Sequence, residues 1–171
     1  MSGARLYLFV GAPGAGKTTV AKIIHEATGA VHLWADQERQ AMFDEVSHSK
    51  AESDELYAYL NRQTDKLLAD GQSVIFDTNF NYHKDREHLR AIAAKHGAET
   101  LIIWLTTPLE VARDRALHEH HRDRNGYDIT MSADQFDQLV SHLEPPIENE
   151  NFIKIDGTNI DTEAVKRHLG I

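Results

Sequence analysis

Cysteine and long hydrophobic runs are both missing from this sequence, and each absence excludes a class of protein. A cysteine count of 0 excludes a disulfide framework, a thiolate nucleophile and a cysteine-ligated zinc site. Hydrophobic runs stay far below the roughly 20 residues that a membrane span needs. The run at residues 6–10 is also too short for a signal peptide. We therefore expect a cytoplasmic protein that does not enter a membrane.

Basic residues are scarce relative to acidic ones. The chain has 18 Lys and Arg against 27 Asp and Glu, a formal net charge of -9 at pH 7. This balance disfavours a surface that coats nucleic acid, although a local cationic groove remains compatible with it. The length of 171 residues corresponds to about one domain. We expect a single domain over residues 1–171, with no repeat, no linker and no obligate protein partner evident.

Short apolar runs alternate with longer amphipathic stretches along the chain. This pattern predicts a three-layer α/β fold, in which helices cover both faces of a parallel sheet. Strands are expected at residues 6–10, 31–34, 73–77, 100–106 and 152–155. Helices are expected at residues 17–28, 53–69, 83–96, 108–121, 132–143 and 161–169. The polar stretch around residues 118–131 is expected to be a lid, and its most mobile part is expected at residues 122–131, which Gly126 interrupts.

The strongest motif lies directly after the first expected strand. Residues 11–18, GAPGAGKT, match G-x-x-x-x-G-K-[ST] at every fixed position and precede an expected helix. Glycines leave backbone N–H groups free to surround a phosphate, and the helix directs its positive end at the same charge. The lysine would reach the β- and γ-phosphates. The residues predicted to bind the nucleotide are Gly11, Ala12, Pro13, Gly14, Ala15, Gly16, Lys17, Thr18 and Thr19.

A magnesium site is expected beside this loop. The Thr18 hydroxyl is suited to ligate Mg²⁺, and Asp77 ends an apolar strand at the sheet edge where ligands bind in open α/β sheets. An aspartate at a strand end is also a common turn former, and this alternative stays open.

A second carboxylate follows the second expected strand. Asp36 and Arg39 are three residues apart on an expected first helical turn, so they face the same way. Asp36 could accept a hydroxyl proton, and Arg39 could hold an anionic group of the acceptor. The alternative is that Asp36 is a helix N-cap and Arg39 a solvated neighbour.

Basic residues gather near the expected lid. Arg113, Arg115, Arg122 and Arg124 could close on the charge that spreads over the phosphate oxygens during transfer, or could form a solvated face. His118, His120 and His121 suggest a metal site, but they lack cysteine partners and an H-E-x-x-H spacing. We therefore do not assign zinc to them.

These residues together resemble the polynucleotide 5′-hydroxyl kinase-like group of small P-loop kinases, which includes predicted kinases related to zeta toxins. The resemblance covers nearly the whole chain. Beyond the phosphate loop it rests on residues 36–39 (DQER), which match a D-x-x-R motif, and residues 77–79 (DTN). Pro108 followed by Arg115, and the late Glu144-Pro145-Pro146, complete the pattern.

The resemblance implies a P-loop NTPase fold with a five-stranded parallel sheet in the order 2-3-1-4-5 and a helical lid. It also implies that Asp36 is the general base, that Arg39 contacts a phosphate of the acceptor, and that lid arginines grip the donor phosphates. The chain departs from the family at one point, because Glu119 stands where a second lid arginine is often found. Arg122 or Arg124 would then supply that charge.

We therefore predict an ATP-dependent, Mg²⁺-dependent kinase that phosphorylates an alcohol, with catalytic residues Lys17, Asp36, Arg39, Arg115, Arg122 and Arg124. The first-choice acceptor is a nucleic-acid or nucleotide 5′-hydroxyl, and the second is a small metabolite or drug, because function lies in the site rather than in the fold. An alternative of another class is a nucleotide-binding switch or ATPase, which would need no acceptor base.

Overall fold

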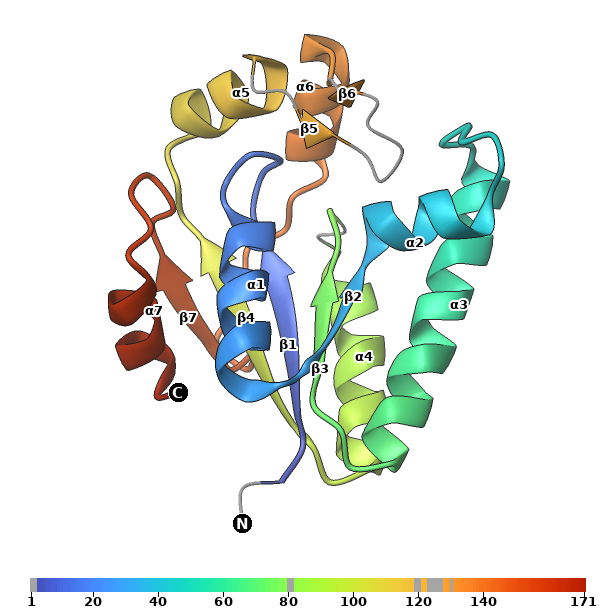
Figure 1. The fold of residues 1–171 in the computed structure, drawn as a ribbon, viewed down its shortest axis with the longest axis vertical. Coiled ribbons are helices and arrows are strands. Elements are labelled where there is room, and N and C mark those ends of the chain that lie inside the picture. Colours follow the sequence, from blue (N-terminus) through green and yellow to red (C-terminus); the bar gives the residue numbers. More distant parts are fainter. Residues whose placement is uncertain (1–2, 80–81, 119–120, 123–127, 130) are drawn as a thin grey trace.

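A computed structural model describes residues 3–79, 82–118, 121–122, 128–129 and 131–171. Its main sheet is parallel throughout and has the order β2-β3-β1-β4-β7 (Figure 1). The strands of this sheet are β1 (Arg5–Val10), β2 (Val31–Trp34), β3 (Val74–Asp77), β4 (Glu99–Leu105) and β7 (Phe152–Ile155). Numbered among themselves, these strands have the order 2-3-1-4-5, which confirms the predicted fold class.

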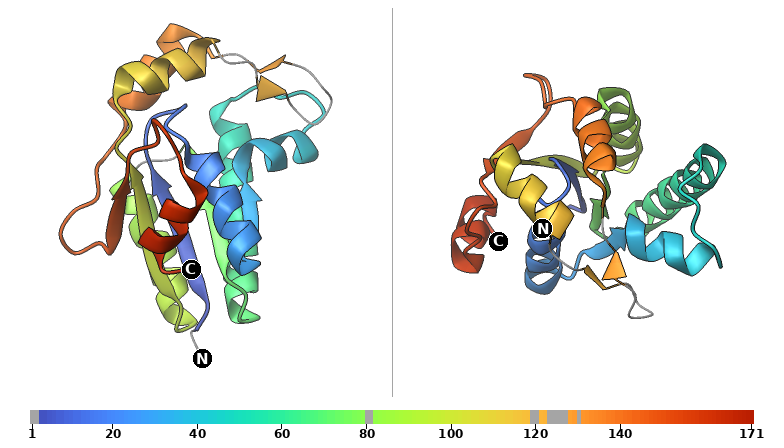
Figure 2. Two further views of the ribbon diagram at one scale, coloured as in Figure 1. Left: turned by 60° about the vertical axis from the view of Figure 1, so that its left-hand side comes forward. Right: turned by 90° about the horizontal axis from the view of Figure 1, so that it is seen from above.

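Helices cover both faces of the sheet. Helices α1 and α7 lie on one face and α3 and α4 on the other (Figures 1 and 2). The helices are α1 (Lys17–Thr28), α2 (Ala35–Met42), α3 (Lys50–Ala69), α4 (His83–Lys95), α5 (Leu109–His118), α6 (Ala133–Ser141) and α7 (Thr162–Leu169). In the described part of the chain, no helix has the length and hydrophobicity required to cross a bilayer.

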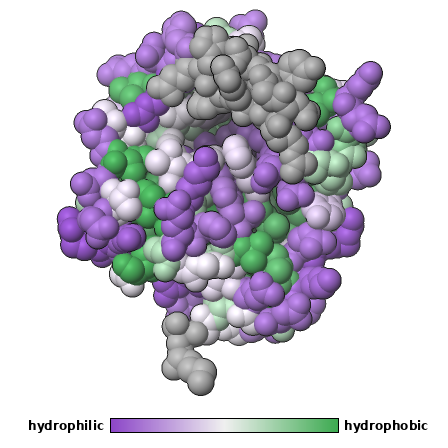
Figure 3. Space-filling view, in the orientation of Figure 1, coloured by the Kyte–Doolittle hydropathy of each residue, from purple (hydrophilic) through white to green (hydrophobic). Residues whose placement is uncertain are grey.

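The central strand β1 explains why both faces need a cover. Tyr7 and Phe9 belong to the core on the α1 and α7 side, whereas Leu6, Leu8 and Val10 belong to the core on the α3 and α4 side. Successive strand residues point to opposite faces, so an apolar strand creates two apolar surfaces. All five side chains are at most 3% exposed. On the outer face seen in Figure 3, hydrophilic residues predominate and hydrophobic ones form separate small groups.

The strand order places the site at one edge of the sheet. The chain moves from β1 outward to β2 and later returns to the other side of β1 with β4, so the order reverses at β1. Ligands of open α/β sheets bind at the carboxyl ends of the strands near such a reversal. Helices α5 and α6, with the short strands β5 (His121–Arg122) and β6 (Asp128–Ile129), lie above this edge (Figures 1 and 2).

Two expected helix boundaries were wrong. Helix α3 begins at Lys50 rather than at residue 53, because the Ser49 side chain accepts a hydrogen bond from the Glu52 amide and caps the helix earlier. Helix α5 ends at His118 rather than near residue 121, because His121 lies in β5, which pairs antiparallel with β6. The other expected strands and helices agree with the structure to within two residues at each end. Helix α2 was expected only as a first helical turn, and β5 and β6 were not expected.

A buried ion pair fixes the segment that follows α6. Arg86, which is fully buried on α4, donates from Nε to Glu150 at 2.9 Å and from Nη1 to the Glu144 carbonyl oxygen at 2.9 Å. A buried charge is stable only when it is paired in this way. The Glu144-Pro145-Pro146 motif therefore anchors the chain between the lid region and β7.

Candidate active site

The phosphate-loop motif connects β1 to α1, as the sequence predicts. Gly14 and Gly16 have φ angles of 79° and 110°, a region that residues with a side chain rarely adopt. A Cβ on Gly14 would also collide with the Ala112 carbonyl oxygen of α5. The N-terminal end of α1 faces the loop, so its free N–H groups and dipole favour an anion there. The loop therefore has the shape and the electrostatics of a phosphate cradle.

Lys17 lies inside the loop. Its Nζ donates to the carbonyl oxygens of Gly11 and Ala12, each at 2.8 Å, and the residue is only 6% exposed. Burial lowers the pKa of Lys17 to about 8, and the negative charges of Asp77 and Asp36 oppose this change. The ammonium group is thus held at a fixed position close to two carboxylates.

Thr18 and Asp77 meet at the start of α1 and the end of β3. The Thr18 hydroxyl donates to Asp77 Oδ2 at 3.0 Å, and Asp77 is 3% exposed. A hydroxyl and a carboxylate are hard oxygen ligands, the type that Mg²⁺ prefers, and Mg²⁺ usually takes its other ligands from phosphates and water. Among the described residues no cluster of three or more His, Asp or Glu could hold a metal. The pair therefore fits Mg²⁺ bound together with a nucleotide.

His32 on β2 contacts this pair, which the sequence analysis missed. Its Nε2 lies 2.9 Å from the same Asp77 Oδ2, and its ring stacks on Trp34 with centroids 6.0 Å apart. Neither residue carries a motif. The only available signal was that alternate residues of one strand face the same side of the sheet.

Asp36 lies in the first turn of α2, directly after β2. The residue is exposed to solvent, yet the surrounding protein desolvates the carboxylate. This desolvation is the largest cause that raises the pKa of Asp36, and the negative charge of Asp77 is the second. Arg39, His48 and Lys17 act in the opposite direction. A carboxylate with a raised pKa next to a phosphate site is suited to accept a proton.

Arg39 has partners that the sequence analysis did not foresee. It is 8% exposed, donating from Nη1 to Glu52 Oε1 at 2.6 Å and from Nη2 to the Ser53 hydroxyl at 3.3 Å. Both partners lie in the first turn of α3. The S-x-x-E spacing of Ser49 and Glu52 was the signal that could have placed that turn.

Tyr57, also on α3, completes this side of the site. Burial raises the pKa of Tyr57 to about 12, and its hydroxyl takes part in a hydrogen bond with Thr78 at the end of β3. The charges of Arg39, Asp36 and Asp85 all influence it. Tyr57 therefore links α3 to the end of β3 on the side of the sheet where Asp36 lies.

Arg115 braces the phosphate loop from α5. Its Nη1 donates to the carbonyl oxygens of Gly157 at 2.8 Å and Gly14 at 3.4 Å, and its Nη2 donates to Thr158 at 2.7 Å. The predicted contact of Arg115 with donor phosphates is untested and stays a prediction.

Thr107 makes a second brace. Its hydroxyl donates to the Ala15 carbonyl at 2.7 Å and accepts from the Gly157 amide at 2.8 Å. A Cβ on Gly157 would collide with the Ala15 carbonyl oxygen. The segments after β4 and β7 thus hold the phosphate loop.

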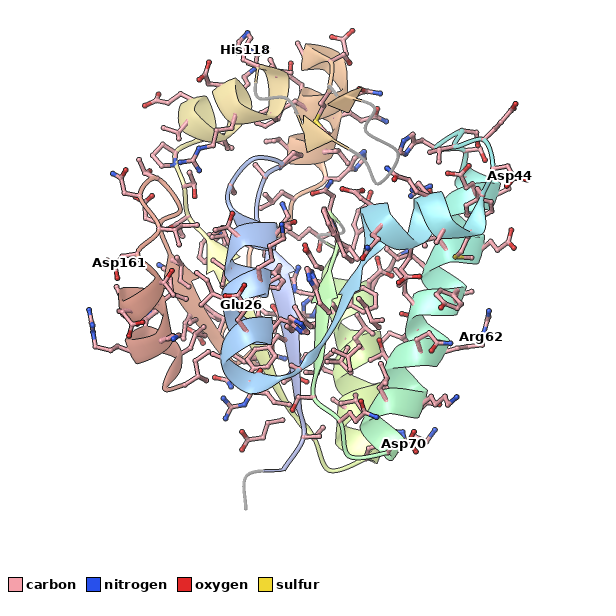
Figure 4. All side chains as sticks on the ribbon, viewed as in Figure 1. Glu26, Asp44, Arg62, Asp70, His118 and Asp161 are labelled. Carbon is pink, nitrogen blue, oxygen red and sulfur yellow. The ribbon has the colours of Figure 1, made fainter. Side chains whose placement is uncertain are left out.

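The remaining predicted lid residues are described only in part. Arg122 lies in the β5 backbone but its side chain, like that of His121, lies outside the described residues, as do Arg124 and His120 entirely. His118 lies at the outer end of α5 (Figure 4), with Nδ1 2.9 Å from Asp114 Oδ1. Thr19 is exposed in the first turn of α1.

Comparison with solved structures finds the same fold in several kinases. A candidate kinase from Chloroflexus aurantiacus has a TM-score of 0.76 and 20% identity, covering 99% of this chain and 98% of that one. A sugar kinase from Janibacter sp. has a TM-score of 0.68 and 21% identity, covering 99% of this chain and 94% of that one. The APS kinase CysC of Mycobacterium tuberculosis was solved in complex with AMPPNP and APS. It has a TM-score of 0.67 and 17% identity, covering 99% of this chain and 98% of that one.

Family comparison adds a match over most of the sequence, whereas no curated protein matches it significantly. The matched residues, 6–146, include the phosphate loop, Asp36, Asp77 and Arg115. The chain therefore belongs to the AAA_33 family, which is described as an AAA domain.

Proposed function

We propose that the protein is a kinase that transfers the γ-phosphoryl group of ATP to a hydroxyl group of a small molecule. The observation that carries this proposal is the position of Asp36, which lies in the first turn of α2, two residues after Trp34, the β2 residue that pairs with Asp77. A nucleotide switch or ATPase needs a phosphate loop but no acceptor base. The fold shared with solved kinases supports the same choice.

The chemistry assigns a separate task to each part of the site. Backbone N–H groups of the phosphate loop, to which Pro13 contributes none, and the Lys17 ammonium bind the phosphates. Thr18 and Asp77 would hold Mg²⁺, which neutralises charge on the phosphates when it is bound. The acceptor hydroxyl gives its proton to Asp36, its oxygen bonds to the γ-phosphorus, and the bond from that phosphorus to the β-phosphate oxygen breaks, releasing ADP. Arg122 and Arg124 stay predicted contacts of the donor phosphates.

A small acceptor is preferred over a polynucleotide 5′-hydroxyl. The solved neighbours include a sugar kinase, a gluconokinase from Sinorhizobium meliloti and an APS kinase, whose names refer to small acceptors. The D-x-x-R spacing of Asp36 and Arg39 favours a 5′-hydroxyl, but Arg39 is held by Glu52. The 5′-hydroxyl end of a nucleic acid is therefore the second candidate acceptor. A separate point is the cytoplasmic location, which stays a prediction.

Replacing Asp36 with Asn tests the proposal directly. Asp36→Asn removes the base while keeping the size of the side chain, so kcat for transfer should fall by roughly 10²- to 10⁴-fold. ATP affinity, measured by titration calorimetry, should stay within about threefold, because Asp36 does not belong to the phosphate loop. Turnover is measured as transfer of labelled γ-phosphate to sugars, nucleosides, amino sugars and 5′-hydroxyl oligonucleotides.

The matched control is Asp44→Asn, because Asp44 is an exposed aspartate at the outer end of the connection from α2 to α3 (Figure 4). It should behave as the wild type. Unchanged transfer by Asp36→Asn would eliminate Asp36 as the base. ATP hydrolysis without transfer to any acceptor would favour the ATPase alternative.

A further inference from the structure

The space beside Asp36 is negatively charged. Trp34 pairs with Asp77 in the sheet and Asp36 follows two residues later, so the negative charge of Asp77 raises the pKa of Asp36. Two aspartates, from α2 and β3, therefore lie close together at the carboxyl ends of β2 and β3.

Three basic residues, Arg39, His48 and Lys17, act against the negative charge at Asp36, and Arg39 has the largest effect of the three on its pKa. Lys17 is held by two loop carbonyl oxygens and serves the donor phosphates. Arg39 is thus the cation that could best bind an anionic group of the acceptor.

Glu52 holds Arg39 more tightly than a surface ion pair would. The side chains are 10% and 6% exposed, and Arg39 Nη1 lies 2.6 Å from Glu52 Oε1. Glu52 also accepts hydrogen bonds from the amides of Ser47 and His48, at 2.7 and 3.2 Å, and from the Ser47 hydroxyl at 2.8 Å. The Ser47 amide is the largest cause that lowers the pKa of Glu52 to about 2, so Glu52 stays ionised. An anion could reach Arg39 only by competing with this carboxylate.

We propose that Glu52 determines acceptor specificity by neutralising Arg39, so that the site selects a polyol or amino sugar without negative charge near the reacting hydroxyl. Hydroxyl and ammonium groups donate hydrogen bonds to carboxylates, whereas a phosphate or carboxylate on the acceptor would be repelled by Asp36 and would compete with Glu52 for Arg39. This inference rests on the proposed function, because it names the substrate class of the same site.

Anion binding at Arg39 tests the inference without requiring that the acceptor be known. The protein is saturated with Mg²⁺ and AMPPNP to block the phosphate loop, and sulfate is added while the Arg39 Nε–H signal is followed by NMR. In the wild type this signal should not shift below about 50 mM sulfate. In Glu52→Gln, which keeps the side-chain size but frees the Arg39 charge, it should shift with at least tenfold higher sulfate affinity.

Glu55→Gln is the matched control, because Glu55 is an exposed carboxylate on the same helix and its loss changes the net charge equally. It should match the wild type. Sulfate binding at Arg39 in the wild type, or equal behaviour of the two variants, would overturn the inference. Because the wild-type measurement decides on its own, a failure of Glu52→Gln to fold does not remove the test.

Transfer rates provide the second readout. With glucose, glucosamine and gluconate as matched acceptors, wild-type kcat/KM for gluconate should be at least tenfold below that for the better of the other two. In Glu52→Gln, the ratio of kcat/KM between the better neutral or amino acceptor and gluconate should be at least tenfold smaller than in the wild type. A wild type that prefers gluconate would contradict the inference. Absence of transfer to every acceptor would count against the proposed kinase activity, whereas the sulfate titration would still decide the role of Glu52.

Discussion

The proposed donor and acceptor sides of the candidate site are built in different ways. On the donor side, backbone groups form the cradle, and Arg115 and Thr107 contact its carbonyl oxygens. On the acceptor side, side chains from α2 and α3 form the site, and Arg39 depends on Glu52 for its position. A cradle made of backbone groups requires glycines at fixed spacing in the sequence. Contacts between side chains of two helices require no such spacing, because the helices meet only in the folded chain. We therefore expect the phosphate loop to serve many reactions and the proposed acceptor side to determine which reaction occurs.

The largest effect that separates the two sides is expected at Lys17. Lys17→Ala removes the one side-chain charge inside the phosphate loop, so kcat/KM for ATP should fall by about 10³-fold. Calorimetry should also show weaker ATP binding by Lys17→Ala, whereas the ATP affinity of Asp36→Asn should stay close to that of the wild type. The control is Lys22→Ala, an exposed lysine farther along α1, which should have little effect. Normal kinetics in Lys17→Ala would refute the donor site.

A smaller effect on the same side is expected at Arg115. Arg115→Gln removes a charged donor from the carbonyl oxygens of Gly157 and Thr158, a contact of roughly 1.5–3 kcal/mol when made by a charged group. The KM for ATP should rise about tenfold while the KM for the acceptor stays constant. Arg113→Gln is the control, because Arg113 lies on the same helix but is exposed and pairs with Asp137 of α6. A change in acceptor KM alone would show that the two sides are not separate.

The smallest change in activity is expected from pH. A rise in pH should weaken the donor side, whereas a fall in pH should weaken the acceptor side. Lys17 binds phosphate as the protonated form, so ATP affinity should fall as pH rises through about 8, by about tenfold at one pH unit above. Asp36 must be ionised, so kcat should fall as pH decreases through its raised pKa. Calorimetry and transfer assays from pH 5 to 9.5 measure both limbs. Loss of the acid limb in Asp36→Asn would identify its source, whereas an acid limb unchanged in that variant would assign it to another group.

Most of the fold could be predicted from the sequence, but less of the candidate site. Apolar runs such as residues 6–10 predicted the strands because strands buried on both faces must be apolar throughout. Gly14 and Lys17 were found because their spacing is fixed by the backbone. Glu52 and His32 were missed, because their contacts depend on how α3 and β2 lie beside other elements. The roles of Arg122 and Arg124 stay predictions.

The brace on the phosphate loop also has a consequence for the order in which the protein becomes functional. The Ala15 carbonyl oxygen is bonded by Thr107, which in turn is bonded by Gly157. During synthesis the glycine-rich loop is made well before Thr107 and Gly157. The phosphate-loop motif is therefore present in the nascent chain before the residues that brace it, and we expect firm nucleotide binding only after Gly157 has been made.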